Sequence, residues 1–122
     1  MASLSDDTLR KILMQIQQTA VESQRALAVT KSTAAAKERE RRILQLTIDE
    51  INSLDNNVNM YKGVGKMFVY TPRPAMGIEL KTQEKELADD INNLNKKSKY
   101  LEKTANEAQA QLRDIFQNAP RS

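Results

Sequence analysis

The sequence predicts a mainly α-helical protein, in which two long helices pair as an antiparallel coiled coil and are joined by a single central β-hairpin. Three observations predict this fold class. Apolar residues recur in heptads through both halves of the chain, β-prone residues and glycines gather in its middle, and no glycine or proline precedes Gly63. The 122 residues are enough for one domain, 1–122.

The composition excludes several classes of function. The chain has no cysteine and no histidine, which removes disulfides, thiol nucleophiles, imidazole bases and ordinary zinc sites. We therefore expect no enzymatic activity, no metal and no cofactor. The net charge of +3 comes from 19 basic and 16 acidic residues that are interspersed, so it does not indicate a nucleic-acid partner.

The hydropathy pattern predicts a protein that neither spans a membrane nor carries a signal peptide. No apolar run approaches 18 residues, and two aspartates interrupt the segment Leu4–Leu9. The expected location is the cytoplasm, with the nucleus as a further possibility.

The first long helix is expected over about residues 5–45. Ser5 is a suitable N-cap residue, and two acidic residues follow it in the first turn. At Thr47 and Glu50 the spacing of a capping box predicts a new start, so we expect the long helix to end near Gln45 and a separate helical turn over about 49–53. A seam of steps of four and three runs through this helix: Leu9, Leu13, Ile16, Ala20, Ser23, Leu27, Thr30, Ala34, Lys37, Arg41 and Leu44.

The hairpin is expected over about residues 57–71. Two β-prone runs, Val58–Lys62 and Lys66–Tyr70, flank a Gly-Val-Gly segment whose glycines can adopt the positive φ of a tight turn. Pro72 cannot donate a hydrogen bond to a sheet, so the second strand is expected to stop before it.

The second strand has apolar side chains on both faces. Met67 and Val69 lie on one face, and Phe68 and Tyr70 lie on the other. Two helices that meet along one seam cannot cover both faces, and the hairpin also has two unpaired edges. The sequence therefore predicts that the hairpin pairs with hairpins of other subunits.

The second long helix is expected over about residues 73–117, because proline is tolerated in a first helical turn. Its seam also continues by steps of four and three: Leu80, Glu84, Leu87, Ile91, Leu94, Ser98, Leu101, Ala105, Ala108, Leu112 and Ile115. Each seam spans five heptads, roughly 52 Å at about 1.5 Å per residue.

Equal seams joined by a hairpin predict a specific antiparallel register. Leu44 should lie near Leu80, and Leu9 near Ile115. The same register opposes Arg41 to Glu84 and sets the segment 37–42 beside three acidic residues: Glu79, Glu84 and Glu86.

Apolar residues also gather at the free ends of the two helices. Three of them, Ile12, Met14 and Phe116, lie off the strict seam. Two interpretations remain open: a wider stripe that closes the end of the coiled coil, or an apolar binding surface. The full group is Leu4, Leu9, Ile12, Leu13, Met14, Ile16, Leu112, Ile115 and Phe116.

The segment Asn59–Phe68, Asn-Met-Tyr-Lys-Gly-Val-Gly-Lys-Met-Phe, closely resembles the hairpin of eukaryotic β-type prefoldin subunits. The segment Lys97–Lys103 and the helix–hairpin–helix layout extend the resemblance over essentially the whole chain. Pro72-Arg73-Pro74 departs from the family pattern, in which a helix N-cap such as serine is expected.

The resemblance implies a chaperone subunit that uses no nucleotide. It implies a heterohexamer, with two α-type and three further β-type subunits as partners, whose hairpins join into a β-barrel platform. The coiled-coil tips would hold unfolded or nascent proteins, notably actin and tubulin, and pass them to the cytosolic group II chaperonin.

The resemblance also implies roles for individual residues. Subunit contacts would be made by Met60, Tyr61, Val64, Met67, Phe68 and Val69. The positions of client contacts at the tips would be held by Leu9, Ile12, Leu13, Leu112, Ile115 and Phe116.

Two other functions compete with this interpretation. The basic residues of segment 37–42 suggest a basic-zipper DNA-binding protein, but acidic residues alternate with them and a hairpin follows. A structural coiled-coil scaffold would use the helices only as a spacer, and the increasing apolar character toward the helix ends speaks against it.

Overall fold

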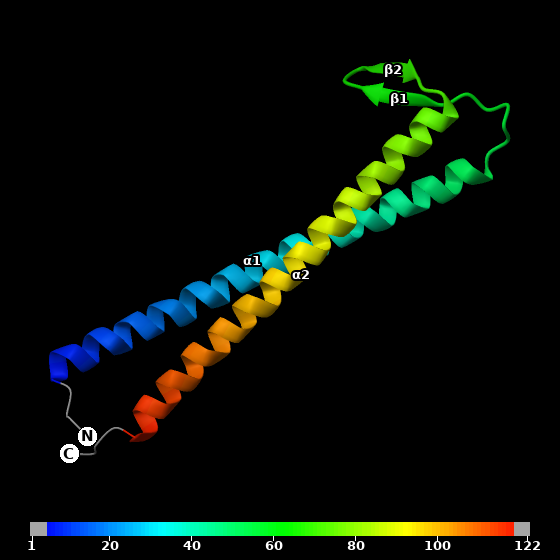
Figure 1. Cartoon of the computed structure of the whole chain (residues 1–122). Helices are drawn as coiled ribbons and strands as arrows, with labels where there is room; N and C mark the ends of the chain where they lie inside the picture. Colours follow the sequence, from blue (N-terminus) through cyan, green and yellow to red (C-terminus); the bar gives the residue numbers. More distant parts are fainter. Residues whose placement is uncertain (1–4, 119–122) are drawn as a thin grey trace. The chain divides into compact units, whose positions relative to one another are not determined.

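A computed structural model describes residues 5–118 of the chain. Leu4, the first member of the apolar group at the helix ends, lies outside the described residues. The elements follow one another as α1, β1, β2 and α2 (Figure 1). The chain divides into two units. We call residues 34–93 the hairpin unit, and residues 5–33 with 94–118 the end unit.

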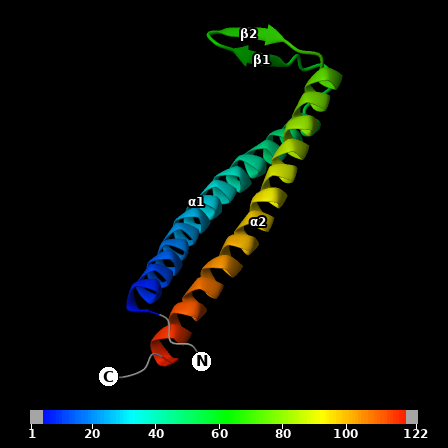
Figure 2. The same ribbon diagram turned by 60° about the vertical axis from the view of Figure 1, so that its left-hand side comes forward.

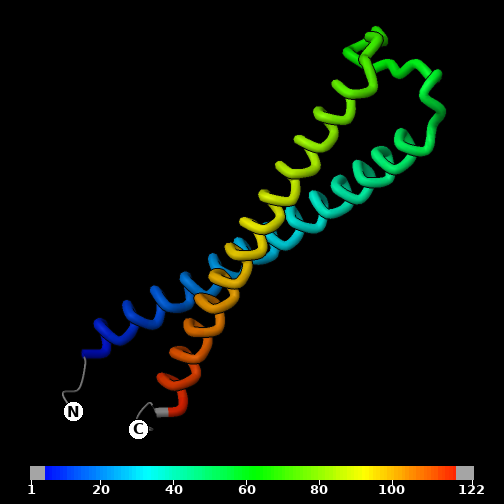
Figure 3. The backbone as a smooth tube through the Cα atoms, turned by 45° about the vertical axis from the view of Figure 1, so that its right-hand side comes forward, coloured from blue at the N-terminus to red at the C-terminus, as the bar shows by residue number. Residues whose placement is uncertain are grey.

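Two long helices and a two-stranded antiparallel hairpin form the protein, as the sequence predicts. Helix α1 spans Asp6–Ser53 and helix α2 spans Arg73–Asn118. Within each unit the two helices run side by side in opposite directions (Figures 2 and 3). None of the helices among residues 5–118 is long and apolar enough to cross a membrane.

Both predicted seams are found along the helix pair. Every seam residue of α1 and α2 is buried or half-buried, whereas most of the remaining helical positions are exposed. The seam also continues beyond its predicted limits, because Ile48, Ile51 and Gly77 are half-buried in the same heptad progression.

The start of α1 follows the expected capping chemistry. The Ser5 hydroxyl accepts a hydrogen bond from the Thr8 backbone N–H at 3.3 Å, and the Ser5 carbonyl accepts one from the Leu9 N–H at 3.0 Å. Ser5 therefore satisfies backbone donors that the first helical turn leaves without partners.

The predicted end of α1 near Gln45 is wrong, since one helix continues to Ser53. Thr47 does not cap a new helix: its hydroxyl donates to the Ile43 carbonyl at 2.9 Å, a bond that a threonine makes inside a continuous helix. No glycine or proline breaks this stretch, and burial of Ile48 and Ile51 on the seam favours continuation. The capping-box spacing is thus coincidental here.

The hairpin is shorter and set later in the chain than the β-prone runs suggest. Strand β1 spans Tyr61–Val64 and β2 spans Met67–Tyr70, with Tyr61 opposite Tyr70 and Val64 opposite Met67. Because Pro72 stops β2, Val58 and Asn59 have no residues left to pair with.

A two-residue turn, Gly65-Lys66, sets this register. Gly65 has a φ of 61°, and no non-glycine residue among those described has a positive φ. A positive φ at the first central position alone is the pattern of a type II′ hairpin turn. Gly63, the other glycine of the Gly-Val-Gly segment, instead lies within β1 opposite Phe68.

Helix α2 begins at Arg73, where the sequence analysis places its start. The Pro72 carbonyl accepts the first helical hydrogen bond, from the Met76 N–H at 2.9 Å. Pro72-Arg73-Pro74 therefore opens the helix without a serine cap, because prolines need no partner for a backbone N–H.

Candidate interaction surfaces of the hairpin and the helix ends

The hairpin presents two different faces, and all eight strand residues are exposed. Alternate residues of a strand point to opposite faces, and residues opposite each other in the register share a face. We call one the aromatic face; its residues are Tyr61, Gly63, Phe68 and Tyr70. The other is the aliphatic face, with Lys62, Val64, Met67 and Val69.

The aromatic face is an ordered but uncovered apolar surface. The rings of Tyr61 and Tyr70 meet edge to face, with centroids 6.0 Å apart and planes at 69°. This geometry is favourable for aromatic pairs. Phe68 is 81% exposed, so nothing in the described chain covers the largest apolar side chain of this face.

Of the six residues expected at subunit contacts, five lie in the exposed strands and one does not. Tyr61, Val64, Met67, Phe68 and Val69 are all exposed in this chain. Met60 is only 8% exposed.

Met60 therefore differs from the other five residues in this chain. It directly precedes β1, and its carbonyl accepts a hydrogen bond from the Thr71 N–H at 2.9 Å. Its side chain packs within its own hairpin unit, which leaves little of it for a partner subunit.

The aliphatic face is tied to the start of α2 by an ion pair between Lys62 and Glu79. The expectation that Glu79 lies beside the basic segment 37–42 is wrong. Lys62 takes that partner because Glu79 lies near the first turns of α2, close to the hairpin rather than to the middle of α1.

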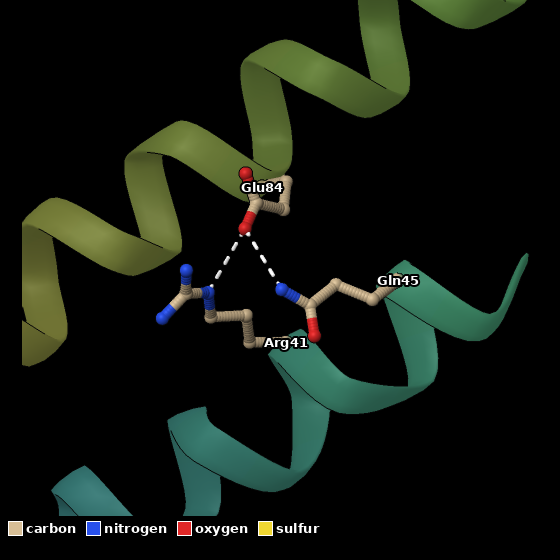
Figure 4. A network of polar contacts seen from close by, with 3 residues as sticks. All are labelled: Arg41, Gln45 and Glu84. Atoms are coloured by element: carbon tan, nitrogen blue, oxygen red, sulfur yellow. Dashed lines mark hydrogen bonds and ion pairs between the residues drawn. The ribbon is translucent and has the colours of Figure 1, made fainter. Parts of the chain in front are cut away.

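The predicted opposition of Arg41 and Glu84 is confirmed. Arg41 Nε donates to Glu84 Oε1 at 2.9 Å, and Gln45 Nε2 donates to the same oxygen at 3.2 Å (Figure 4). The hydrogen bond from Arg41, followed by that from Gln45, lowers the pKa of the Glu84 carboxyl, and desolvation of the carboxylate opposes this shift.

A second cross-helix ion pair joins Lys37 and Asp90 at 3.4 Å. Lys37 and Arg41 therefore face acidic partners on α2. The alternative of a basic-zipper DNA-binding protein, which requires an uninterrupted basic helix face, is not supported.

Arg73 has a role that was not predicted from the sequence. Its guanidinium donates to the carbonyls of Ile51 at 3.1 Å, Leu54 at 3.2 Å and Asp55 at 2.7 Å. Ile51 lies in the last turn of α1, and Leu54 and Asp55 directly follow the helix, so Arg73 at the start of α2 caps the end of α1 and holds the chain that leaves it. The unusual arginine between two prolines was the available signal.

The structure separates the two interpretations of the apolar helix ends by residue. Five of the six expected tip residues are half-buried: Leu9, Ile12, Leu13, Leu112 and Ile115. Half-burial of the off-seam Ile12 fits a widened stripe that closes the helix pair. Phe116, 64% exposed, and Met14, 68% exposed, do not contribute to that closure.

The acidic side chains of the described residues were compared with the arrangement that a metal site requires. Among residues 5–118, no group of three or more acidic side chains is placed to hold a metal ion.

Comparison with known proteins identifies the family. A sequence model of the family described as "Prefoldin subunit" matches residues 13–119. The chain belongs to the prefoldin subunit family. This prefoldin chain is thus a chaperone subunit that assembles with other prefoldin subunits.

The chain is similar to curated prefoldin proteins from distant eukaryotes. It is 29% identical to prefoldin subunit 1 of Homo sapiens over 116 residues, covering 95% of each protein. It is 33% identical to a probable prefoldin subunit 1 of Schizosaccharomyces pombe over 107 residues, covering 88% of this chain and 96% of that protein. A probable prefoldin subunit 1 of Dictyostelium discoideum is 32% identical over 91 residues, 75% of this chain and 79% of that protein.

A solved structure agrees with the prefoldin fold. The crystal structure of the prefoldin beta subunit from Thermococcus strain KS-1 matches with a TM-score of 0.78, over 99% of this chain and 100% of that chain, at 22% identity. The two-helix architecture with one hairpin is thus the fold of a β-type prefoldin subunit.

Proposed function

We propose that this chain is one of four β-type subunits in a prefoldin heterohexamer that also holds two α-type subunits. It holds unfolded or nascent proteins of the actin and tubulin class at its helix ends. It delivers them to the group II chaperonin of the cytosol, without a nucleotide and without enzymatic turnover.

The exposed hairpin is the observation that carries this proposal. Both faces of the hairpin expose apolar side chains in the chain by itself, and a two-stranded sheet is marginally stable in water. Pairing with the hairpins of other subunits would cover both faces and both edges. A β-barrel built from several hairpins is the closed form of such a sheet.

The helix ends support the holding role. Met14 and Phe116 expose apolar side chains there, and methionine adapts to partners of different shape. Each contact of this kind is weak. Several arms in one assembly raise the effective concentration of such contacts, so a client is held firmly and yet released without an energy source.

The assembly role is tested by Phe68→Asp, with Tyr100→Asp as the matched control. Both wild-type side chains are exposed aromatics, at 81% and 69%, but Tyr100 lies on α2 in the end unit. A buried carboxylate in a subunit interface is strongly unfavourable. We expect Phe68→Asp to abolish co-purification with the other subunits while Tyr100→Asp assembles normally. An intact hexamer with Phe68→Asp would refute the assembly role.

The holding role is tested on assembled hexamers by removal of residues 1–13 and 112–122, and more finely by the pair Met14→Ser and Phe116→Ser. Val29→Ser is the control, because Val29 is equally exposed, at 66%, but lies away from the helix ends. We expect the truncation and the paired substitution to weaken suppression of aggregation of diluted, denatured actin severalfold, with the control unchanged. Undiminished suppression would refute the tip role of this subunit, and hexamers that lack suppression altogether would favour a scaffold.

A further inference from the structure

Gly63 is unexplained by the conformation of its own backbone. It lies inside β1, where glycine weakens a strand because it loses more conformational freedom and offers no side chain to pack. Gly65 differs, since its φ of 61° is a conformation that favours glycine. Gly63 has no positive φ, so any residue could adopt its backbone conformation.

Packing within the chain does not explain Gly63 either. A Cβ atom built on Gly63 would meet no other atom within 4 Å. Aromatic side chains sometimes cover a glycine on the neighbouring strand, but Phe68, its partner in the register, does not lie over it and is 81% exposed. The chain itself therefore leaves the space above Gly63 open.

The alternation of hydrogen-bonded and non-hydrogen-bonded pairs in the hairpin shows which side chain lies next to this space. The Thr71 N–H donates to the Met60 carbonyl, which marks the pair 60–71 as hydrogen-bonded. Pairs alternate along an antiparallel ladder, so 61–70 and 63–68 are non-hydrogen-bonded pairs, whose side chains approach each other most closely. The missing side chain thus leaves a gap beside Phe68, at the position where a cross-strand partner would stand. We call it the Gly63 gap.

The charges of the two faces indicate what the gap can receive. The aromatic face carries no charged side chain, whereas the aliphatic face carries Lys62, which is paired with Glu79 of its own chain. A charged group placed in the gap would be desolvated beside Phe68 with no oppositely charged side chain on this face. An apolar side chain would bury Phe68 without that cost.

We propose that the Gly63 gap is a socket that receives an apolar side chain of a neighbouring prefoldin subunit, which packs against Phe68. This inference rests on the proposed assembly through the hairpin. It assigns Gly63 as a residue that determines the fit between subunits, and it selects the aromatic face as the face on which that side chain inserts.

The experiment is a size series, Gly63→Ala and Gly63→Val, made in the full chain and co-expressed with the other subunits of its prefoldin. In the isolated chain, the added groups meet no atom, so helix content and thermal unfolding by circular dichroism should be unchanged or slightly improved. In the complex, the same groups fill the socket. Native mass spectrometry should therefore show assembly weakened severalfold by Ala and tenfold or more by Val.

Gly77→Ala is the matched control. Gly77 also has space for a Cβ atom, with nothing within 4 Å, but it lies in α2 rather than in the hairpin. We expect it to leave assembly unchanged. Equal weakening by Gly77→Ala, or a loss of stability of the isolated Gly63 variants that matches their loss of assembly, would overturn the socket.

The result separates this inference from the proposal on which it rests. If Phe68→Asp prevents assembly but Gly63→Val assembles as well as the wild type, the hairpin interface stands and the socket is refuted. If Phe68→Asp assembles normally, the hairpin interface itself fails. Loss of assembly in both, with Gly63→Ala between the wild type and Gly63→Val, supports the socket.

Discussion

The end unit and the hairpin unit use different interactions to hold the same pair of helices. In the hairpin unit, side chains bond across elements, as in the contacts of Arg41 with Glu84, Lys37 with Asp90, and Arg73 with the end of α1. In the end unit, the side-chain hydrogen bonds among described residues stay within one helix. Its buried residues are mostly small: Ala20, Ser23, Leu27, Thr30, Ala105 and Ala108.

The two units differ in whether the contacts between their helices depend on direction. A hydrogen bond or a bidentate contact fixes one register, because a shift by one residue breaks it. Contacts between small apolar side chains require close approach but have no preferred direction, so one helix can shift slightly along the other while the two stay in contact. The hairpin unit is thus specified by polar contacts, and the end unit by close packing that tolerates adjustment. Such tolerance suits the role that we propose for the helix ends, which is to hold clients of many shapes.

The largest effect is expected from overpacking the end unit with Ala105→Leu. Ala105 is 1% exposed, so a larger side chain must force the helices apart, at a cost of about 2–3 kcal/mol in the free energy of unfolding. Ala110→Leu, at an exposed position of the same helix, is the control and should be nearly neutral. Urea unfolding measures both. A cost below about 0.5 kcal/mol would mean that the end unit does not depend on close packing.

The next effect is expected from the cap in the hairpin unit. Arg73→Ala removes three hydrogen bonds to carbonyls and should lower the free energy of unfolding by about 1.5 kcal/mol. Arg73→Lys should recover little of it, because an ammonium group lacks the planar fork. The exposed Arg42→Ala is the control. In Arg73→Ala, faster amide hydrogen exchange confined to the last turn of α1 would show that the stability is lost there. Exchange at the wild-type rate in that turn would contradict the capping role.

A stabilising change is expected in the end unit from Ser98→Ala. Among the described residues, the buried Ser98 hydroxyl meets no hydrogen-bond partner, and removal of an unsatisfied polar group should raise the free energy of unfolding by about 1 kcal/mol. Ser32→Ala, at an exposed helix position, measures the gain from helix propensity alone. Equal gains at both sites would show that the Ser98 hydroxyl is not penalised by burial.

The smallest effect is a change in pH dependence in the hairpin unit. Because the pKa of Glu84 is lowered in the folded chain, its contribution is complete above the unfolded pKa and is lost as the pH falls through the folded pKa. The wild type should lose stability as the pH falls from the unfolded pKa of a glutamate through the lowered folded pKa of Glu84, and Glu84→Gln should lose less in that window. Arg41→Ala should flatten the profile similarly, since Arg41 is the main cause of the shift. Parallel profiles for all three proteins would contradict this account, and thermal unfolding at several pH values measures them.

Much of the helix pair could be predicted from the sequence, because a heptad repeat places its seam residues along one side of a helix, where they face the partner helix. Seam positions such as Ala20 and Ile91 are buried where the pattern places them, and the equal seams bring Arg41 to Glu84. The hairpin was recognisable from its glycines and β-prone residues. Its register was not, because the turn could use either glycine for a positive φ, and only Gly65 does.

The errors occurred where a local pattern competed with the fold. Thr47 and Glu50 have the spacing of a capping box, but the seam residues around them keep α1 helical. Arg73 bonds to carbonyls about twenty residues away along the chain. Contacts of this kind depend on how the hairpin folds back, which no residue pattern encodes.

The bare hairpin has a consequence for the amounts in which the subunits are made. A chain synthesised in excess of its partners displays Phe68, Met67 and two open strand edges to the solvent. Surfaces of this kind drive self-association, and they are also what chaperones bind. A surplus subunit of the complex would therefore become a client, and we expect its supply to be matched closely to that of its neighbours.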